Sequence, residues 1–146
     1  MHRYLVVANQ TLAGHHLFDY VRQCLAAGPC WFFVLVPATL IHEHIEWTTD
    51  EAHALARRRL NGALARFEAE GATATGAVGD RSPLQAVVDV LREQDFDEII
   101  LSTLPVGASR WLYEDLPSRL ARATGLRVTH LIAEGQVNPE PKALSS

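Results

Sequence analysis

The chain has 146 residues, of which 48% are hydrophobic and 21% are charged, and its 13 basic and 17 acidic side chains give a formal net charge of −4 at pH 7. This composition matches that of an average soluble domain and argues against a disordered chain. The acidic balance argues against general nucleic-acid binding, which requires a basic face.

Five short apolar segments are predicted to be strands because they are rich in branched or aromatic residues and are bounded by turn residues. In chain order they are residues 4–8, 31–36, 72–78, 98–101 and 128–132. The segment 72–78 has small residues and a glycine, as expected of a strand at the edge of a sheet.

Four segments between these strands have the three- and four-residue apolar spacing of helices. They are residues 17–27, 48–67, 82–91 and 118–124. Thr48 and Glu51 form a capping box for the second helix. Ser82 is predicted to cap the third helix, with Pro83 at its first position.

The alternation of strands and helices predicts an α/β domain with a mostly parallel sheet and helices on both faces. We expect one domain over residues 1–133, followed by a flexible, turn-rich tail over residues 134–146. In such sheets a ligand binds beyond the carboxyl ends of the strands, where the strand order reverses. This rule selects four loops, at residues 9–11, 36–47, 79–81 and 102–116.

Cysteine content and hydropathy favour the cytoplasm. Cys24 and Cys30 do not make a disulfide framework, so we expect reduced, partly buried thiols. The longest apolar run, residues 30–36, is far shorter than the roughly 18 residues that a membrane span requires. The first residues also lack the apolar region of a signal peptide. We therefore expect a cytoplasmic protein with no membrane partner.

Motifs of common nucleotide and hydrolase sites are missing from the sequence. No G-x-x-x-x-G-K-[ST] occurs, and no G-x-G-x-x-G follows the first strand. Leu12-Ala13-Gly14-His15 lies where nucleotidyltransferases carry H-x-G-H, but Leu12 removes one of the two imidazoles that would neutralise a transferring phosphate. Ser102 is not in a G-x-S-x-G elbow, and Cys24 lies in an apolar helical pattern. We assign no catalytic residue and expect a protein that is not an enzyme.

One cluster of candidate metal ligands follows the second strand. His42, His44 and Glu46 alternate, so an extended backbone would direct all three side chains to one side, where a metal such as zinc could bind. A further ligand could come from His15, His16 or His53. The simpler interpretation is a solvated loop, and we assign no metal site. A metal-dependent enzyme that uses His42 and His44 is kept as an alternative.

The loop after the fourth strand is the best candidate for ligand contact. It brings the hydroxyls of Ser102, Thr103 and Ser109 together with Gly107 and Arg110 ahead of a helix. Hydroxyls, free backbone amides and a guanidinium at the start of a helix can bind an anion. Ser109 and Asp115 are the candidate caps of that helix.

Four arginines fall in the second predicted helix, at Arg57, Arg58, Arg59 and Arg66. The first three are consecutive and cover most of one helical turn. We therefore interpret these arginines as a solvated helix face and not as a phosphate clamp.

Three segments resemble the universal stress protein family. They are the opening strand Tyr4-Leu5-Val6-Val7-Ala8-Asn9, the Gly79-Asp80-Arg81-Ser82-Pro83 lead into the third helix, and the strand, loop, helix and strand over residues 98–132. The resemblance implies a three-layer α/β/α fold, like that of the adenine nucleotide alpha hydrolases, with five parallel strands in the order 3-2-1-4-5. It also implies a homodimer through the edge of the fifth strand, which here comprises Arg127, Val128, Thr129, His130, Leu131 and Ile132.

ATP-binding members of that family carry Gly-x2-Gly-x9-Gly-Ser after the fourth strand, where the glycines let backbone amides approach the phosphates. On this chain the pattern falls on Ser102, Pro105, Asp115 and Leu116, so every position differs. Pro105 has no amide donor, and Asp115 would set a carboxylate against phosphate oxygens. Asn9 replaces the Asp that contacts the adenosine moiety in the family.

The resemblance thus implies a stress-response domain with an altered crevice, whose ligand would be ATP, another adenine nucleotide or another small anion. The candidate binding residues are Asn9, Thr11, Val36, Ser102, Thr103, Gly107, Ser109 and Arg110. Besides the metal-dependent enzyme, the sequence leaves open a protein-interaction module whose crevice is closed by Leu104, Pro105 and Leu116.

Overall fold

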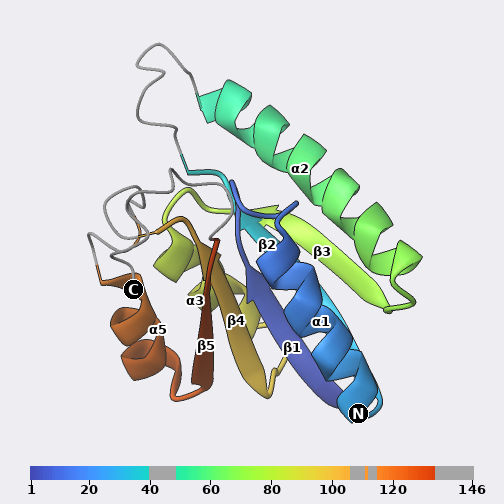
Figure 1. Cartoon of the computed structure of the whole chain (residues 1–146). Coiled ribbons are helices and arrows are strands. Elements are labelled where there is room, and N and C mark those ends of the chain that lie inside the picture. The colour runs from blue at the N-terminus through green and yellow to red at the C-terminus, as the bar shows by residue number, and fades with distance from the viewer. Residues whose placement is uncertain (40–48, 106–110, 112–114, 134–146) are drawn as a thin grey trace.

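The computed structural model describes residues 1–39, 49–105, 111 and 115–133, over which strands and helices alternate (Figure 1). The elements are β1 (His2–Val7), α1 (His15–Ala27), β2 (Cys30–Pro37), α2 (Thr49–Ala69), β3 (Ala74–Gly79), α3 (Pro83–Leu91), β4 (Glu98–Thr103), α5 (Leu116–Thr124) and β5 (Arg127–Ile132). This order confirms the predicted α/β class.

The five strands form one parallel sheet in the order β3-β2-β1-β4-β5. Strand β1 is central: Val6 pairs with Val34 of β2 on one side and with Ile100 of β4 on the other. The order implied by the family resemblance is confirmed, and so is the edge position of the glycine-containing third strand. Strands β2 and β3 are added on one side of β1, and β4 and β5 on the other, so the strand order reverses between β1 and β4 and a crevice is expected at their carboxyl ends.

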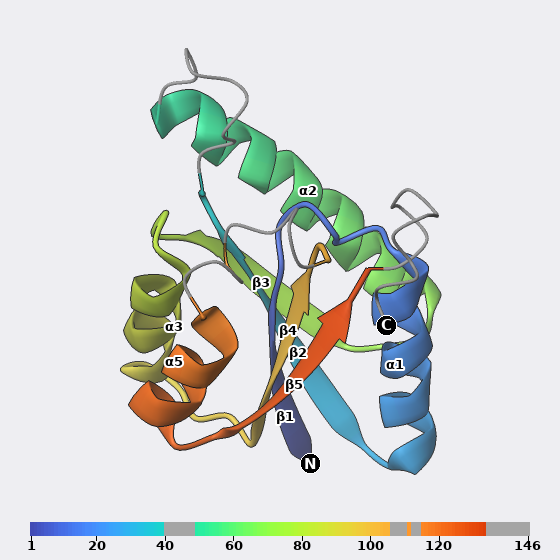
Figure 2. The same cartoon turned by 60° about the vertical axis from the view of Figure 1, so that its left-hand side comes forward.

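Alternate residues of β1 belong to two separate hydrophobic clusters. Tyr4 and Val6 pack with buried residues of α1 and α2. Leu5 and Val7 pack with buried residues of α3 and α5. Figure 2 shows the corresponding layers, with α1 and α2 on one face of the sheet and α3 and α5 on the other. Both faces of the central strands are therefore buried, which explains why their sequences are almost entirely apolar.

Helix starts follow the predicted capping residues in one case and depart from them in another. The amide of Gln85 donates to Ser82 Oγ over 3.3 Å, and Pro83 is the first residue of α3, as predicted. Asp115 precedes α5 in a left-handed conformation, with φ 57° and ψ 44°, and its side chain makes no capping hydrogen bond. The prediction of Asp115 as a side-chain cap is therefore wrong. Thr48 and Ser109 lie outside the described residues.

The two cysteines are free thiols and are buried, Cys24 in α1 and Cys30 at the start of β2. The thiol of Cys30 donates a weak hydrogen bond to the carbonyl of Cys24 over 3.8 Å. Burial raises the pKa of both thiols, which suits a packing role. Within the described residues, no helix has both the length and the hydropathy that a membrane crossing would require.

Candidate functional site

A hydrogen-bonded polar cluster joins the carboxyl ends of β1 and β4. Thr11, in the loop after β1, lies with its Oγ1 2.5 Å from Ser102 Oγ of β4. The Nε2 atom of His16, in the first turn of α1, lies 2.7 Å from the same Ser102 oxygen. Thr11 and Ser102 are almost fully buried, at 2% and 1% exposure. The loop after β1 is therefore fixed to the end of β4 by side-chain contacts.

Gly14 makes room for the imidazole in this cluster. A Cβ atom at Gly14 would lie 2.5 Å from ring atoms of His16 and 3.3 Å from the carbonyl oxygen of Thr11. Sequence reasoning considered His16 only as an extra metal ligand and missed its contact with Ser102. The one signal for that contact was the position of His16, at a helix start directly after the first crevice loop.

The pairing of Ser102 with His16 has the residue types of a nucleophile and its base. Ser102 is 1% exposed, however, and Thr11 Oγ1 also occupies its hydroxyl. A reacting carbonyl would have no access to Ser102 Oγ in this arrangement, so the cluster suits positioning of the loop better than covalent chemistry.

Asn9 uses both ends of its side-chain amide within the protein. Its Nδ2 donates to the carbonyl oxygen of Pro37 over 2.7 Å, which ties the loop after β1 to the end of β2. Its Oδ1 accepts a hydrogen bond from Nη1 of Arg59 in α2. Asn9 is 6% exposed, so these contacts are made away from bulk water.

Arg59 departs from the prediction of a solvated arginine face. Arg57 and Arg58 are exposed, as predicted, but Arg59 is only partly exposed and its guanidinium reaches Asn9. The pKa of Arg59 is lowered, first by burial and then by the neighbouring charge of Arg58. The prediction is therefore wrong for Arg59, whose partly buried contact with Asn9 cannot be inferred from local helix spacing.

A cavity of about 350 Å³ lies between the loop after β1 and the side of α2. The loop contributes Asn9, Gln10, Leu12 and Ala13, and α2 contributes Arg59, Gly62, Ala63 and Arg66. Two arginines and no carboxylate are among these lining residues, so the charge of the cavity wall is positive.

A second polar pair links the ends of β4 and β5. Thr103 Oγ1 lies 2.8 Å from Nε2 of His130, and the amide of Ala133 donates to the carbonyl of Thr103 over 2.9 Å. Burial lowers the pKa of the half-buried His130, because it disfavours the charged imidazolium. The Thr103 hydroxyl thus contacts His130, and the Thr103 carbonyl accepts from Ala133, so both groups help to hold β5 against β4.

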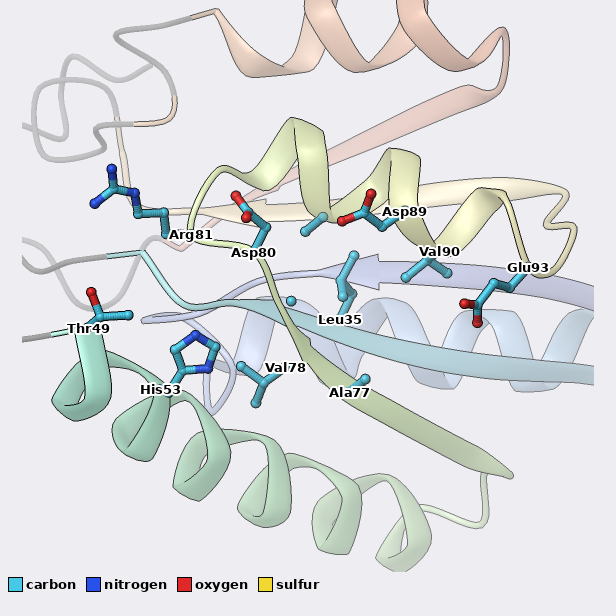
Figure 3. Close-up of a pocket in the computed structure, with 12 residues that line it drawn as sticks. Leu35, Thr49, His53, Ala77, Val78, Asp80, Arg81, Asp89, Val90 and Glu93 are labelled. Atoms are coloured by element: carbon cyan, nitrogen blue, oxygen red, sulfur yellow. The ribbon is translucent and has the colours of Figure 1, made fainter.

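A larger pocket, of about 560 Å³, lies at the β3 edge, between the start of α2 and α3 (Figure 3). Thr49 and His53 line it from α2, while Asp89 and Glu93 line it from α3. Asp80 also lines it, but its carboxylate accepts from the amide of Ser82 and so supports the turn into α3. The predicted crevice loop at residues 79–81 therefore borders a pocket, but one that is remote from Ser102 in the sheet order.

The structure brings together some of the predicted binding residues. Thr11 and Ser102 are in direct contact. Asn9 and Thr103 lie, like them, at the carboxyl ends of the strands, and Val36 is fully buried in β2. Gly107, Ser109 and Arg110 lie outside the described residues, as do His42, His44 and Glu46. Among the residues that are described, no group of three His, Cys, Asp or Glu side chains is placed to hold a metal ion.

No protein-family model and no curated protein matches the chain. Solved structures do match. A universal stress protein from Archaeoglobus fulgidus, in complex with dAMP, has a TM-score of 0.63 and 15% identity over 90% of this chain and 97% of its own. A universal stress protein family protein from Arabidopsis thaliana, with AMP bound, has a TM-score of 0.64 and 7% identity over 97% and 99%. A universal stress protein in complex with cAMP has a TM-score of 0.58 and 19% identity over 91% and 98%. These likenesses establish a shared fold.

Proposed function

We propose that the chain is a divergent universal stress protein that binds an adenine nucleotide in the crevice between β1 and β4. The observation that carries the proposal is the reversal of strand order between β1 and β4, where hydrogen bonds of Asn9, Thr11, Ser102 and Thr103 fix the ends of the strands and the loop after β1 in place. Proteins of the same fold have been solved with AMP, dAMP and cAMP. The protein acts by binding and not by catalysis, and it forms a homodimer through β5.

The backbone at Asp115 supports the comparison with the glycine pattern of the family. Asp115 is the one described non-glycine residue with positive φ, and left-handed backbone is the conformation that glycine adopts without strain. The chain thus keeps a glycine-like turn and adds a carboxylate to it. That carboxylate repels a polyphosphate, so we propose that a monophosphate is preferred over ATP.

Binding is tested by titrating adenosine, AMP, cAMP and ATP while following heat release and thermal unfolding. A ligand present at 100 times its Kd raises the free energy of unfolding by about 2.7 kcal/mol, so even weak binding is measurable. We expect AMP to bind more tightly than ATP. The absence of a response to every adenine compound would overturn the proposal and favour a protein-interaction module.

The role of Asp115 is tested by Asp115→Gly. Removing the carboxylate from a turn that glycine already favours should raise the affinity for ATP relative to that for AMP by about fivefold or more, since a repulsion between two such charges costs about 1 kcal/mol or more. Asp95→Gly is the matched control, because Asp95 is exposed and lies before the opposite end of β4. An equal effect in both variants would show that net charge alone decides the preference.

A further inference from the structure

The geometry points to a phosphate-binding site in the cavity between the loop after β1 and α2, with Arg59 and Arg66 as its cationic residues. This site is lined by the loop and by α2, whereas Ser102 contacts the same loop from β4. It goes beyond the proposed nucleotide crevice, because inorganic phosphate alone would be a ligand for it. The phosphate of a bound nucleotide has the same chemistry and is the second source.

The spacing of α2 explains how the two arginines face one cavity. Positions 59, 62, 63 and 66 follow the pattern i, i+3, i+4, i+7, which places all four side chains on one face of a helix. Seven residues of α-helix span about 10.5 Å. Gly62 and Ala63, which lie between the arginines, are small, and a Cβ atom added at Gly62 would meet nothing within 4 Å. The face therefore consists of two long cationic side chains with a gap between them.

Arg59 carries a charge that none of the described residues neutralises. Its hydrogen-bond acceptor is the neutral amide oxygen of Asn9. Among the described residues, each ion pair involves another cation, namely His2, Arg22, Arg66 or Arg92. The electrostatic influence of Arg58 on Arg59 is repulsive. A partly buried guanidinium in such surroundings is stabilised by a bound anion.

The guanidinium of Arg66 is positioned by Phe18 and Glu70 and has further N–H donors that an anion could bind. Its guanidinium carbon lies 4.3 Å from the centre of the Phe18 ring, and its Nε lies 3.5 Å from Glu70 Oε2. Arg22 already binds Glu70 through two hydrogen bonds of 2.9 and 3.0 Å, so Glu70 is shared between two cations. A guanidinium has five N–H donors in a planar fork that matches phosphate oxygens. Arg66 can therefore contact an anion without losing Glu70.

The experiment is a titration of the ¹⁵N-labelled full chain with inorganic phosphate at constant ionic strength, followed by NMR. We expect the amides of Gly62 and Ala63 to shift along one binding curve. Arg59→Gln should weaken phosphate binding about tenfold or more, because the loss of a hydrogen bond between charged groups lowers an affinity by about that factor. Asn9→Asp should weaken it similarly, because a nearly isosteric carboxylate would neutralise Arg59. Arg57→Gln removes the same charge from an exposed position of α2 and should change the affinity by less than about twofold.

Two further probes separate the sources of phosphate. If AMP binds more tightly than adenosine and Arg59→Gln removes the difference, the nucleotide supplies the phosphate. If AMP and adenosine bind equally while inorganic phosphate responds to Arg59→Gln, free phosphate is the ligand. Either result supports the site.

The site is overturned if phosphate leaves Gly62 and Ala63 unshifted in the wild-type chain, or if Arg57→Gln weakens binding as much as Arg59→Gln. Adenine compounds that bind while inorganic phosphate gives no response that depends on Arg59 would overturn this inference alone. Phosphate that binds through Arg59 while no adenine compound binds would overturn the proposed nucleotide function alone.

Discussion

Asn9 has a structural role that few other side chains could fill. It donates to the carbonyl of Pro37 and accepts from Arg59, so it joins the ends of β1 and β2 to the middle of α2. An aspartate could accept from Arg59 but could not donate to Pro37 when ionised, and an aliphatic residue could do neither. The amide thus connects three elements while adding no charge to the arginine cavity.

The pH dependence of stability should contain a contribution from His130. Burial lowers its pKa below the ordinary value of 6.5. As pH falls through about 6.5, the unfolded chain binds a proton that the folded chain still excludes, so the free energy of unfolding falls. This contribution is fully present above the unfolded pKa. His130→Gln should therefore lose less stability than the wild type between about pH 7 and about pH 5, as measured by urea unfolding.

His15→Gln is the control for that prediction, because His15 is an exposed histidine in the same chain. It should keep the wild-type dependence on pH. If His130→Gln and the wild type lose stability in parallel, the imidazole of His130 is as easily protonated in the folded chain as in the unfolded one.

The contacts of single residues show what sequence reasoning could reach. Thr11 and Ser102 were predicted to lie near each other, since both follow parallel strands at the same edge of a sheet, and they are in contact. Arg59 and His16 were missed. Their partners, Asn9 and Ser102, are 50 and 86 positions away, and such contacts depend on how a helix is placed over the sheet. Local spacing does not determine that placement.

The packing of α2 against β3 depends on a glycine. A Cβ atom at Gly76 would overlap the carbonyl oxygen of Val34 and lie 2.8 Å from Cδ1 of Leu60 in α2. Gly76→Ala should lower the free energy of unfolding by about 1–3 kcal/mol, the usual cost of overpacking, because the backbone of β2 cannot move away without losing its pairing. Denaturant unfolding measures the change.

Gly62→Ala provides the opposite expectation within α2. Gly62 has open space at its Cβ position, so alanine should stabilise the helix by about 0.8–1 kcal/mol. A Gly76→Ala chain that is as stable as the wild type would mean that α2 can shift outward from β3 at no cost.

The strands and helices were largely predictable as elements, because the strands are short apolar runs bounded by turn residues and the helices have a periodic apolar pattern. Their bounds were less so. Strand β1 begins at His2, two residues before the apolar run, since the amide of Arg3 donates to Asp97 and its guanidinium lies 4.9 Å from the centre of the Trp31 ring. These partners come from other parts of the chain, so the local pattern of β1 could not include them.

The order of the strands is a property of the whole molecule that alternation alone did not determine. Strand–helix alternation predicts parallel pairing, but five strands of this kind can be arranged in several orders. The order 3-2-1-4-5 came from the family resemblance, and the sheet confirms it. The ends of this sheet are β3 and β5, and both are open to further pairing within the described chain.

The proposed homodimer gives a prediction at the same scale. Ile132, at the end of β5, is one of the exposed large hydrophobic side chains, at 37% exposure. Ile132→Lys would place like charges across a two-fold interface and should weaken dimerisation by about tenfold or more, as measured by sedimentation at micromolar concentration. Thr75→Lys, an exposed position on β3 at the opposite edge, should have no effect. A wild-type chain that sediments as a monomer would contradict the dimer.

The central place of β1 has a consequence for how the molecule folds. Its pairing with β2 joins His2 to Cys30, 28 positions apart, whereas its pairing with β4 joins Tyr4 to Glu98, 94 positions apart. Closing the longer loop costs only about 1 kcal/mol more in chain entropy, but contacts between distant segments form slowly. Strands β1, β2 and β3 can thus assemble under α1 and α2 while the other edge of β1 is still unpaired. During that interval the unpaired edge of β1 can pair with other molecules. The refolding yield should therefore depend on how quickly β4 pairs with β1.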